Sequence, residues 1–175
     1  MALSKVDGIN LITGLPAGSV LQVVQTFKSD AFSSTDDGFF DITGLSVAIT
    51  PSSSSNKVLV ISDLAIGSSD LYSYNHGFKV LRDSTDVGIS TAGSTNFSGG
   101  VNMYLSAGNI PYLFGTMKMF LDSPSSTSAL TYEVGLKNIQ DTALTYYVNR
   151  TYGDADNDNY RPRATSSITV MEVAG

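Results

Sequence analysis

The chain has 175 residues, a net charge of −6 and no cysteine. A chain of this length is typical of a single domain. The lack of cysteine excludes disulfides, thiolate zinc sites and cysteine nucleophiles. Only 15% of the residues are charged, so the chain lacks the clustered Lys and Arg that nucleic-acid binding needs. No apolar run reaches the length of a membrane span, and we expect neither nucleic-acid binding nor membrane insertion.

The first eighteen residues differ from the rest: the run "INLITGLPAGSV" is apolar but follows neither a helical nor a strand period, and Gly and Pro interrupt it. An apolar, irregular terminus is unfavourable in water. We therefore predict an N-terminal arm over residues 1–18 that docks into a partner; packing on its own domain is the alternative. The side chains expected to anchor this arm are Ile9, Leu11, Ile12, Leu15 and Pro16.

From residue 19 onward, nearly every apolar run is short and ends at Gly, Pro, Asn, Asp or Ser. Many short strands with frequent turns predict an all-β fold, a jelly-roll-like antiparallel β-sandwich over residues 19–175. The strands are predicted near residues 19–28, 39–50, 57–67, 76–83, 101–106, 111–122, 130–138, 143–150 and 164–173.

The run "FFDITGLSVAIT" changes phase in its middle. Phe40 and Ile42 share one face of a strand, whereas Leu45, Val47 and Ile49 have the opposite parity. One extra residue at Thr43-Gly44 returns both sets to the core, which is the effect of a β-bulge. Glycine adopts positive φ angles without strain, so the sequence predicts a bulge at Gly44, with a tight turn as the alternative.

Two serine-rich segments follow predicted strands: "PSSSS" at 51–55 and "PSSTS" at 124–128. Proline presets the backbone angle of a turn, and serine hydroxyls bond to nearby backbone groups. A linker is the alternative, but the residues before "PSSSS" are too few for a separate core. Both segments are therefore predicted to be turns between strands.

Two predicted strands are apolar on both faces, "KVLVISDLAIG" and "SITVMEV". A strand of this kind is covered on both sides, and a two-sheet sandwich covers only one. Association of identical chains supplies the second cover; a loop that folds back is the alternative. The side chains predicted to form this oligomer interface are Val58, Val60, Met171 and Val173.

Tyrosines are numerous for this length, and several fall in or beside loops 68–76 and 151–163. Tyrosine among Gly, Ser and Asn is typical of recognition surfaces, and its flat ring suits the apolar face of a sugar. Half-buried strand tyrosines are the alternative for about half of them. The predicted recognition residues are Tyr72, Tyr74, Tyr152, Tyr160, Arg161 and Arg163.

Asp154, Asp156 and Asp158 repeat the spacing that opens a calcium loop, but Asn159 stands in place of the required Gly. A solvated acidic loop is favoured, and an irregular calcium site is the alternative. His76 is the single histidine, and no nucleophile motif accompanies it. We expect no cofactor, no resident metal and no enzymatic activity.

Taken together, several segments resemble a family of short structural proteins of tailed bacteriophages, especially phages of cyanobacteria. These proteins are labelled tail-fibre or virion structural proteins. The segments span nearly the whole chain and consist of turns and strands, with no catalytic signature. They are "GLPAGSVLQVVQT" at 14–26, "FDITGLSVAITPSSSSNKVLVI" at 40–61, "FKVLRDST" at 78–85, "FLDSPSSTSALTYEVGL" at 120–136 and "TSSITVMEV" at 165–173.

The resemblance implies a β-sandwich module displayed on the virion, commonly as a homotrimer. The favoured function is a trimeric tail-fibre or adhesin component that contacts a host-surface glycan. In that role the arm attaches the module to other virion proteins. A capsid decoration protein, such as a cement protein or head fibre, is the first alternative. A small carbohydrate-active enzyme is the weaker one, because no nucleophile or base constellation is present.

Overall fold

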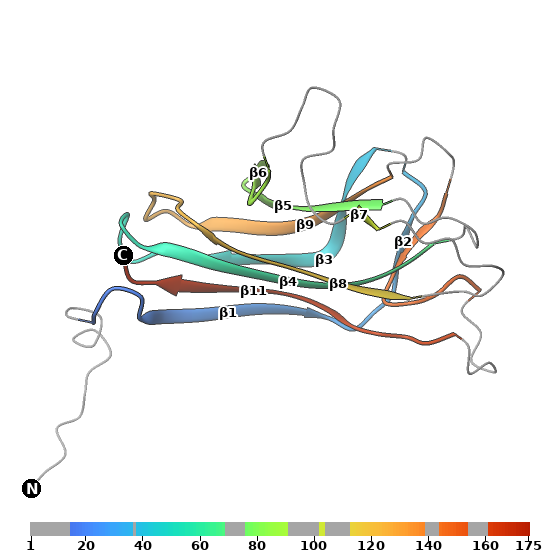
Figure 1. Ribbon diagram of the computed structural model, residues 1–175, viewed down its shortest axis with the longest axis horizontal. Helices are drawn as coiled ribbons and strands as arrows, with labels where there is room; N and C mark the ends of the chain where they lie inside the picture. The colour runs from blue at the N-terminus through green and yellow to red at the C-terminus, as the bar shows by residue number, and fades with distance from the viewer. Residues whose placement is uncertain are drawn as a thin grey trace, which may run out of the picture.

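The computed structural model describes residues 15–36, 38–68, 76–90, 102–103, 113–138, 144–153 and 161–175. These residues form two antiparallel β-sheets stacked face to face, with the C-terminus at one end of the sandwich (Figure 1). Strands of both sheets alternate in burial, so one face of each sheet packs into a shared core.

The first sheet has four long strands in the order β1-β11-β4-β8. Their bounds are β1 Val20–Lys28, β11 Ser166–Val173, β4 Lys57–Ser68 and β8 Phe114–Asp122. Two short strands, β10 Tyr146–Val148 and β2 Phe32–Ser34, continue the sheet beside the far end of β4.

The second sheet has the order β3-β9-β5-β6, and a short strand β7 also pairs with β5. Its bounds are β3 Phe39–Ile49, β9 Leu130–Asn138, β5 His76–Arg82, β6 Thr85–Val87 and β7 Asn102–Met103.

The strand order is that of a jelly roll. With the short strands β2, β7 and β10 set aside, eight strands remain in two sheets of four. When these eight strands are numbered along the chain, neighbouring strands in one sheet are the first, eighth, third and sixth. In the other sheet they are the second, seventh, fourth and fifth. Every connection except the β5–β6 hairpin crosses between the sheets, as two interlocked Greek keys require. The predicted jelly-roll-like sandwich is confirmed.

Each predicted strand has a counterpart in the structure, and two were missed. The missed strands, β2 and β6, have only three residues each, too few for a period of two to show. The expected strand at 101–106 is described only as β7.

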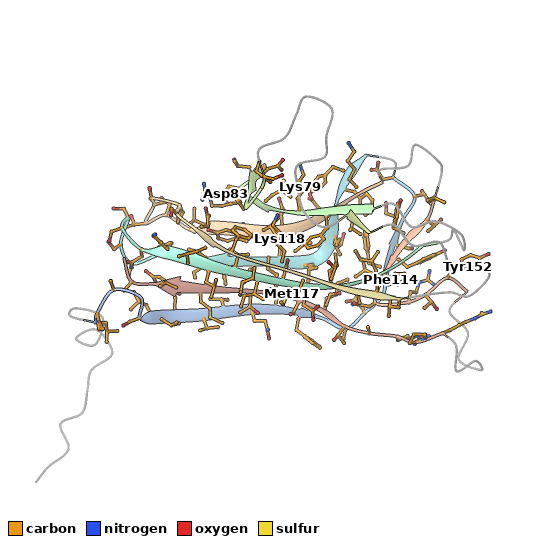
Figure 2. All side chains as sticks on the ribbon, in the orientation of Figure 1. Lys79, Asp83, Phe114, Met117, Lys118 and Tyr152 are labelled. Atoms are coloured by element: carbon orange, nitrogen blue, oxygen red, sulfur yellow. The ribbon has the colours of Figure 1, made fainter. Side chains whose placement is uncertain are left out.

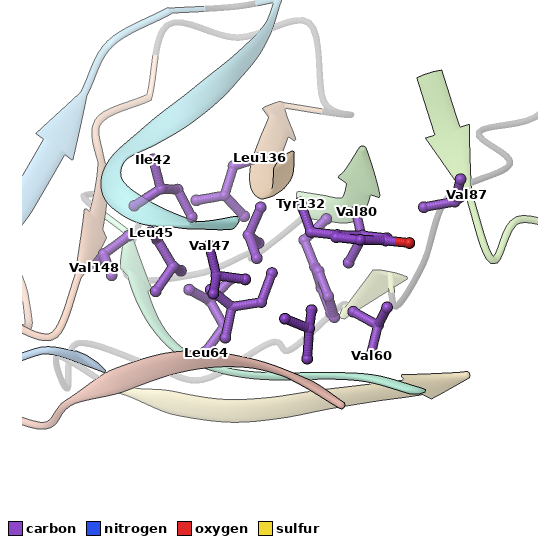
Figure 3. Close-up of a cluster of buried hydrophobic side chains, with 14 of the residues drawn as sticks. Ile42, Leu45, Val47, Val60, Leu64, Val80, Val87, Tyr132, Leu136 and Val148 are labelled. Carbon is purple, nitrogen blue, oxygen red and sulfur yellow. The ribbon is translucent and has the colours of Figure 1, made fainter. Parts of the chain in front are cut away.

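The core is formed by apolar side chains from both sheets. Figure 3 shows Val60 and Leu64 of β4 facing Val47, Tyr132 and Val80 of the second sheet. The predicted bulge in β3 is confirmed, because Gly44 has a φ of +81° and the pairing register shifts around it.

The irregularity in β3 is larger than the single extra residue predicted. Five steps along β3, from Asp41 to Ser46, face only two steps along β9, from Gly135 to Glu133. The offset is still odd. It therefore turns all five apolar residues inward: Phe40, Ile42, Leu45, Val47 and Ile49.

A buried glutamate fixes the first serine-rich turn. Glu172 of β11 is 1% exposed, and its Oε1 accepts bonds from the Ser52 backbone N–H and from Asn56 Nδ2, both at 2.6 Å. Its Oε2 accepts from Gln22 Nε2, also at 2.6 Å. Burial opposes ionisation, but these hydrogen bonds outweigh it and lower the pKa of Glu172. Residues 50–56 thus connect β3 to β4 as a turn, as predicted.

Candidate functional site

One end of the sandwich gathers aromatic and cationic side chains, here called the Tyr–Arg cluster: Tyr147, Arg150, Tyr152, Arg161 and Arg163. The guanidinium carbon of Arg150 lies 4.3 Å from the centre of the Tyr147 ring, within the range of a cation–π contact. The Tyr147 and Tyr152 rings are 6.4 Å apart at an angle of 48°. Arg161 Nη1 donates to the carbonyl of Gly153.

The backbone beneath the cluster is held by Asn149. This residue has a φ of +66°, a conformation that Asn adopts more readily than most residues. Its Nδ2 donates to the carbonyls of Lys28 and Asp30, at 2.9 and 3.0 Å, and its Oδ1 accepts from Ser166 Oγ at 2.6 Å. A β-bridge then joins Arg150 to Arg163. The cluster therefore stands on fixed backbone, a requirement for pre-organised recognition.

Exposure within the cluster is graded. Tyr147 is 8% exposed and Tyr152 is 45% exposed, so Tyr152 is the ring of the pair that reaches solvent. Tyr152 lies at the end of the sandwich opposite the C-terminus (Figures 1 and 2). Two guanidinium groups lie near these residues: Arg150 stacks on Tyr147, and Arg161 bonds to the backbone next to Tyr152. Such a surface suits a sugar that carries hydroxyl or acidic groups.

The structure places only part of the predicted recognition set. Tyr152, Arg161 and Arg163 belong to the cluster, whereas Tyr72, Tyr74 and Tyr160 lie outside the described residues. Sequence reasoning missed Tyr147 and Arg150. No motif could have found them, because their place beside Tyr152 depends on the pairing of β10 with β4 and on the bridge at Arg163.

Other predicted sites fall partly outside the described residues. Asp154, Asp156 and Asp158 lie there, as do the arm residues Ile9, Leu11 and Ile12. Leu15 and Pro16 are exposed. The chain joins the sandwich just after them, where the Gly18 N–H donates to the carbonyl of Ala174 at 2.8 Å. Within the described ranges, no three His, Asp or Glu side chains are grouped to hold a metal ion.

A second surface is the outer face of the first sheet, and here part of the predicted interface is wrong. Val58 and Val60 are 0% exposed and belong to the core. The side chains of β4 that point outward are Leu59 and Ile61, which are half-buried. Met171 and Val173 do lie on the outer face. The prediction was wrong because even- and odd-numbered residues of β4 are both apolar. Periodicity then shows which residues share a face but not which face packs into the core.

The two sheets are also joined by a half-buried polar contact. Tyr132 Oη of β9 donates to Asp122 Oδ2 of β8 at 2.7 Å, and Arg82 of β5 forms an ion pair with the same carboxylate. Burial opposes the charge on Arg82, yet the bond with Asp122 prevails and raises its pKa. Burial raises the pKa of Tyr132 as well, and the neighbouring Asp122 adds to this. These groups satisfy one another and tie the sheets together.

Within the part of the chain that the structure describes, no helix is long and apolar enough to cross a membrane.

No protein-family model matches the chain, and no curated protein matches it. Among solved structures, the chain is similar to that of the infectious bursal disease virus Gx strain, with a TM-score of 0.40 and 13% identity. That match covers 90% of this chain and 43% of the other. It is also similar to the crystal structure of the infectious bursal disease virus VP2 subviral particle, with a TM-score of 0.30 and 14% identity. That match covers 87% of this chain and 41% of the other.

The chain thus spans less than half the length of each of these two structures. At such TM-scores the likenesses carry no functional argument. The assignment of the fold rests on the strand order instead.

Proposed function

We propose that this protein is a structural component of a virus particle, a trimeric tail-fibre or adhesin module that contacts a host-surface glycan. The observation that carries the proposal is the Tyr–Arg cluster, an exposed ring beside arginines on a rigid sandwich end. Two further features support it. The sequence resembles bacteriophage structural proteins over nearly its whole length, and the jelly roll recurs in capsid and lectin domains. The second of these is an analogy of fold only.

The chemistry of the cluster favours a sugar over an apolar ligand. Tyr152 offers about half of its surface to solvent, and an aromatic ring stacks on the apolar face of a pyranose. The neighbouring arginines supply donors in a planar fork, which suits carboxylate or phosphate groups on the glycan. Tyr147 lies in β10, and the other four members of the cluster lie between β10 and β11; segments that connect strands carry recognition on a rigid scaffold.

The arm is proposed to attach the module to other virion proteins. Deletion of residues 1–17 is then expected to leave the sandwich folded and to stop its incorporation into particles, as measured by thermal melting and by the protein content of purified particles. Incorporation of the truncated protein, or loss of its thermal transition, would show that the arm has a structural role instead.

Replacement of Tyr152 by Ala tests the recognition surface. Loss of a stacked ring at a binding hot spot costs about 2 kcal/mol or more, roughly thirtyfold in affinity. The readout is binding of purified protein to host cells or to their lipopolysaccharide. Ile89→Ala is a matched control, because Ile89 is 44% exposed where Tyr152 is 45% exposed. We expect a loss for Tyr152→Ala alone, with unchanged melting temperatures for both variants.

Unchanged binding by a folded Tyr152→Ala protein would contradict the assignment of the surface. If the wild-type protein bound no host material at all, capsid decoration would replace the adhesin as the proposed role. Cryo-electron microscopy of intact particles separates the two, since an adhesin is expected on the tail and a decoration protein on the shell.

A further inference from the structure

The outer face of the first sheet carries most of the exposed apolar surface in the described part of the chain. Of the nine large hydrophobic side chains that are clearly exposed, six lie on this face. They are Val20 at 52%, Val23 at 56%, Phe27 at 61%, Met117 at 61%, Met119 at 60% and Leu121 at 49%. Single exposed apolar residues need no explanation, but a contiguous patch of them marks an interaction site.

One cross-strand row on this face is apolar throughout, and the neighbouring rows are partly apolar. Pairing places Val23 beside Met171, Met171 beside Leu59, and Leu59 beside Leu121. The row is apolar over all four long strands of the sheet. In the next row Ile61 and Met119 are direct partners, whereas β11 and β1 contribute Thr169 and Gln25, which are hydrogen-bonded to each other.

The size of the face suits an interface between proteins. Four strands about 4.8 Å apart, each with about eight residues at 3.3 Å, cover roughly 500 Å² in plan. A standard protein interface buries about 800 Å² on each partner. The plan area of the whole four-strand face is therefore of the same order as one side of a standard interface, with apolar side chains at its centre and polar side chains around them.

Two charged residues bound these rows on β4. Lys57 lies at one end and Asp63 at the other, and both are exposed. Neither takes part in the salt bridges found among the described residues. Read along its outer face, β4 thus presents a positive charge, two aliphatic side chains and a negative charge. A second copy placed antiparallel over the first brings each lysine to an aspartate, so the face is complementary to itself.

We propose that copies of this chain bind one another through the outer face of β8, β4, β11 and β1, with Lys57 of one copy against Asp63 of the next. This inference goes beyond the proposed function: the contact is two-fold and joins two copies, so it is separate from the contacts within the proposed trimer. The apolar rows supply the affinity, because they leave water on contact. The charged ends select the direction in which the faces meet.

Cross-linking tests the contact directly, because the chain has no cysteine of its own. Lys57→Cys and Asp63→Cys proteins are co-expressed and treated with a short bis-maleimide. Within one chain the two positions lie about 20 Å apart, six residues along a strand, beyond the reach of the reagent. We expect a covalent product from the mixture and little from either variant alone. Lys57→Cys with Ser46→Cys, on the second sheet, is the matched control and is expected to give none.

The double variant Lys57→Cys/Asp63→Cys then counts the copies. A product of two chains on a denaturing gel supports the proposal, because a face that is complementary to itself closes as a pair. A ladder of three or more linked chains would contradict the two-fold contact. If the wild-type protein is an oligomer but these two positions give no cross-link, the proposed contact surface is wrong and the copies associate through another surface. A monomeric wild type that associates only after deletion of residues 1–14 would also overturn it, because the chain's own N-terminal segment would then cover the face.

Met119→Lys supplies a second readout. Met119 is 60% exposed, so the change is expected to leave the fold intact and to weaken self-association at least tenfold, as followed by sedimentation. Ala48→Lys on the exposed face of the second sheet is the control and is expected to change nothing. Equal association of the two variants would contradict the proposal. The location of the protein on particles is measured separately, so failure here does not decide the proposed function.

Discussion

The outer faces of the two sheets differ sharply, although the strands beneath them pack into the same core. The second sheet exposes charged and small side chains, among them Asp41, Ser46 and Lys137. Its Lys79 is paired with Asp86 at 2.6 Å and lies 4.3 Å from the centre of the Phe39 ring. The first sheet exposes aliphatic, methionine and phenylalanine side chains in rows. A sheet face whose charged side chains are polar and paired with one another is typical of a face in contact with solvent. An extended apolar face is typical of a surface that binds a partner.

The sharpest test of inside against outside compares two neighbours on β4. Val60 is 0% exposed in the core, whereas Leu59 points to the outer face. Val60→Asp places an unpaired charge in a dry core, which is expected to cost more than about 4 kcal/mol and to abolish the folded state. Leu59→Asp is expected to fold and to lose self-association. Circular dichroism melting measures the folding of both variants, and sedimentation measures the self-association of Leu59→Asp. A cooperative melting transition in Val60→Asp would contradict the assignment of faces.

Glu172 is buried on the inward side of β11 and accepts several hydrogen bonds, so its removal is expected to have the next largest effect. Glu172→Ala leaves donors from Gln22, Ser52 and Asn56 without their acceptor. A buried donor without a partner costs about 1–3 kcal/mol, and we expect a loss of about 3 kcal/mol in the free energy of unfolding by urea titration. Glu172→Gln keeps part of the acceptor and is expected to lose less. Equal losses of unfolding free energy in the two variants would show that these hydrogen bonds do not account for the contribution of Glu172 to stability.

Acid is expected to act through the same carboxylate. The pKa of Glu172 lies below its ordinary value of 4.5, so below that value the unfolded chain binds more protons than the folded one. The stability that Glu172 contributes is therefore complete above about pH 4.5 and declines as the pH falls through its lowered pKa. Melting temperatures measured from pH 6 to pH 3 are expected to fall more steeply for the wild type than for Glu172→Gln. Parallel curves would contradict this role.

The smallest effect concerns the bulge that keeps the second sheet polar outside. Gly44 has a φ of +81°, and a side chain in that conformation costs about 1–2 kcal/mol. Gly44→Ala is expected to lower the free energy of unfolding by about 1 kcal/mol, and Ser46→Ala, on the exposed face of the same strand, by less than about 0.5 kcal/mol. If Gly44→Ala were as mild as its control, the bulge would not depend on glycine.

Sequence reasoning reached the strands and the fold class because alternation and turn residues are local signals. It found the bulge at Gly44 for the same reason, since a change of parity is visible in the chain itself. It failed at Val58 and Val60, where both parities are apolar and the inward side is chosen by distant residues. Glu172 is one of them: it reads as a surface residue, and only the donors from β1 and from the turn after β3 make its burial favourable.

The candidate sites divide in the same way. Tyr152, Arg161 and Arg163 were predicted from the composition of one loop. Tyr147 and Arg150 join them only through strand pairing between distant segments. The apolar rows of the first sheet likewise exist only in the pairing register, because Val23, Met171, Leu59 and Leu121 come from four separate parts of the chain.

The mass of the purified protein in solution tests the central claim most directly. If the outer face of the first sheet is built for another copy, multi-angle light scattering at micromolar concentration gives a small multiple of the 18.5 kDa chain mass, and Met119→Lys returns it toward the single-chain value. A wild-type mass of 18.5 kDa at that concentration would contradict the account.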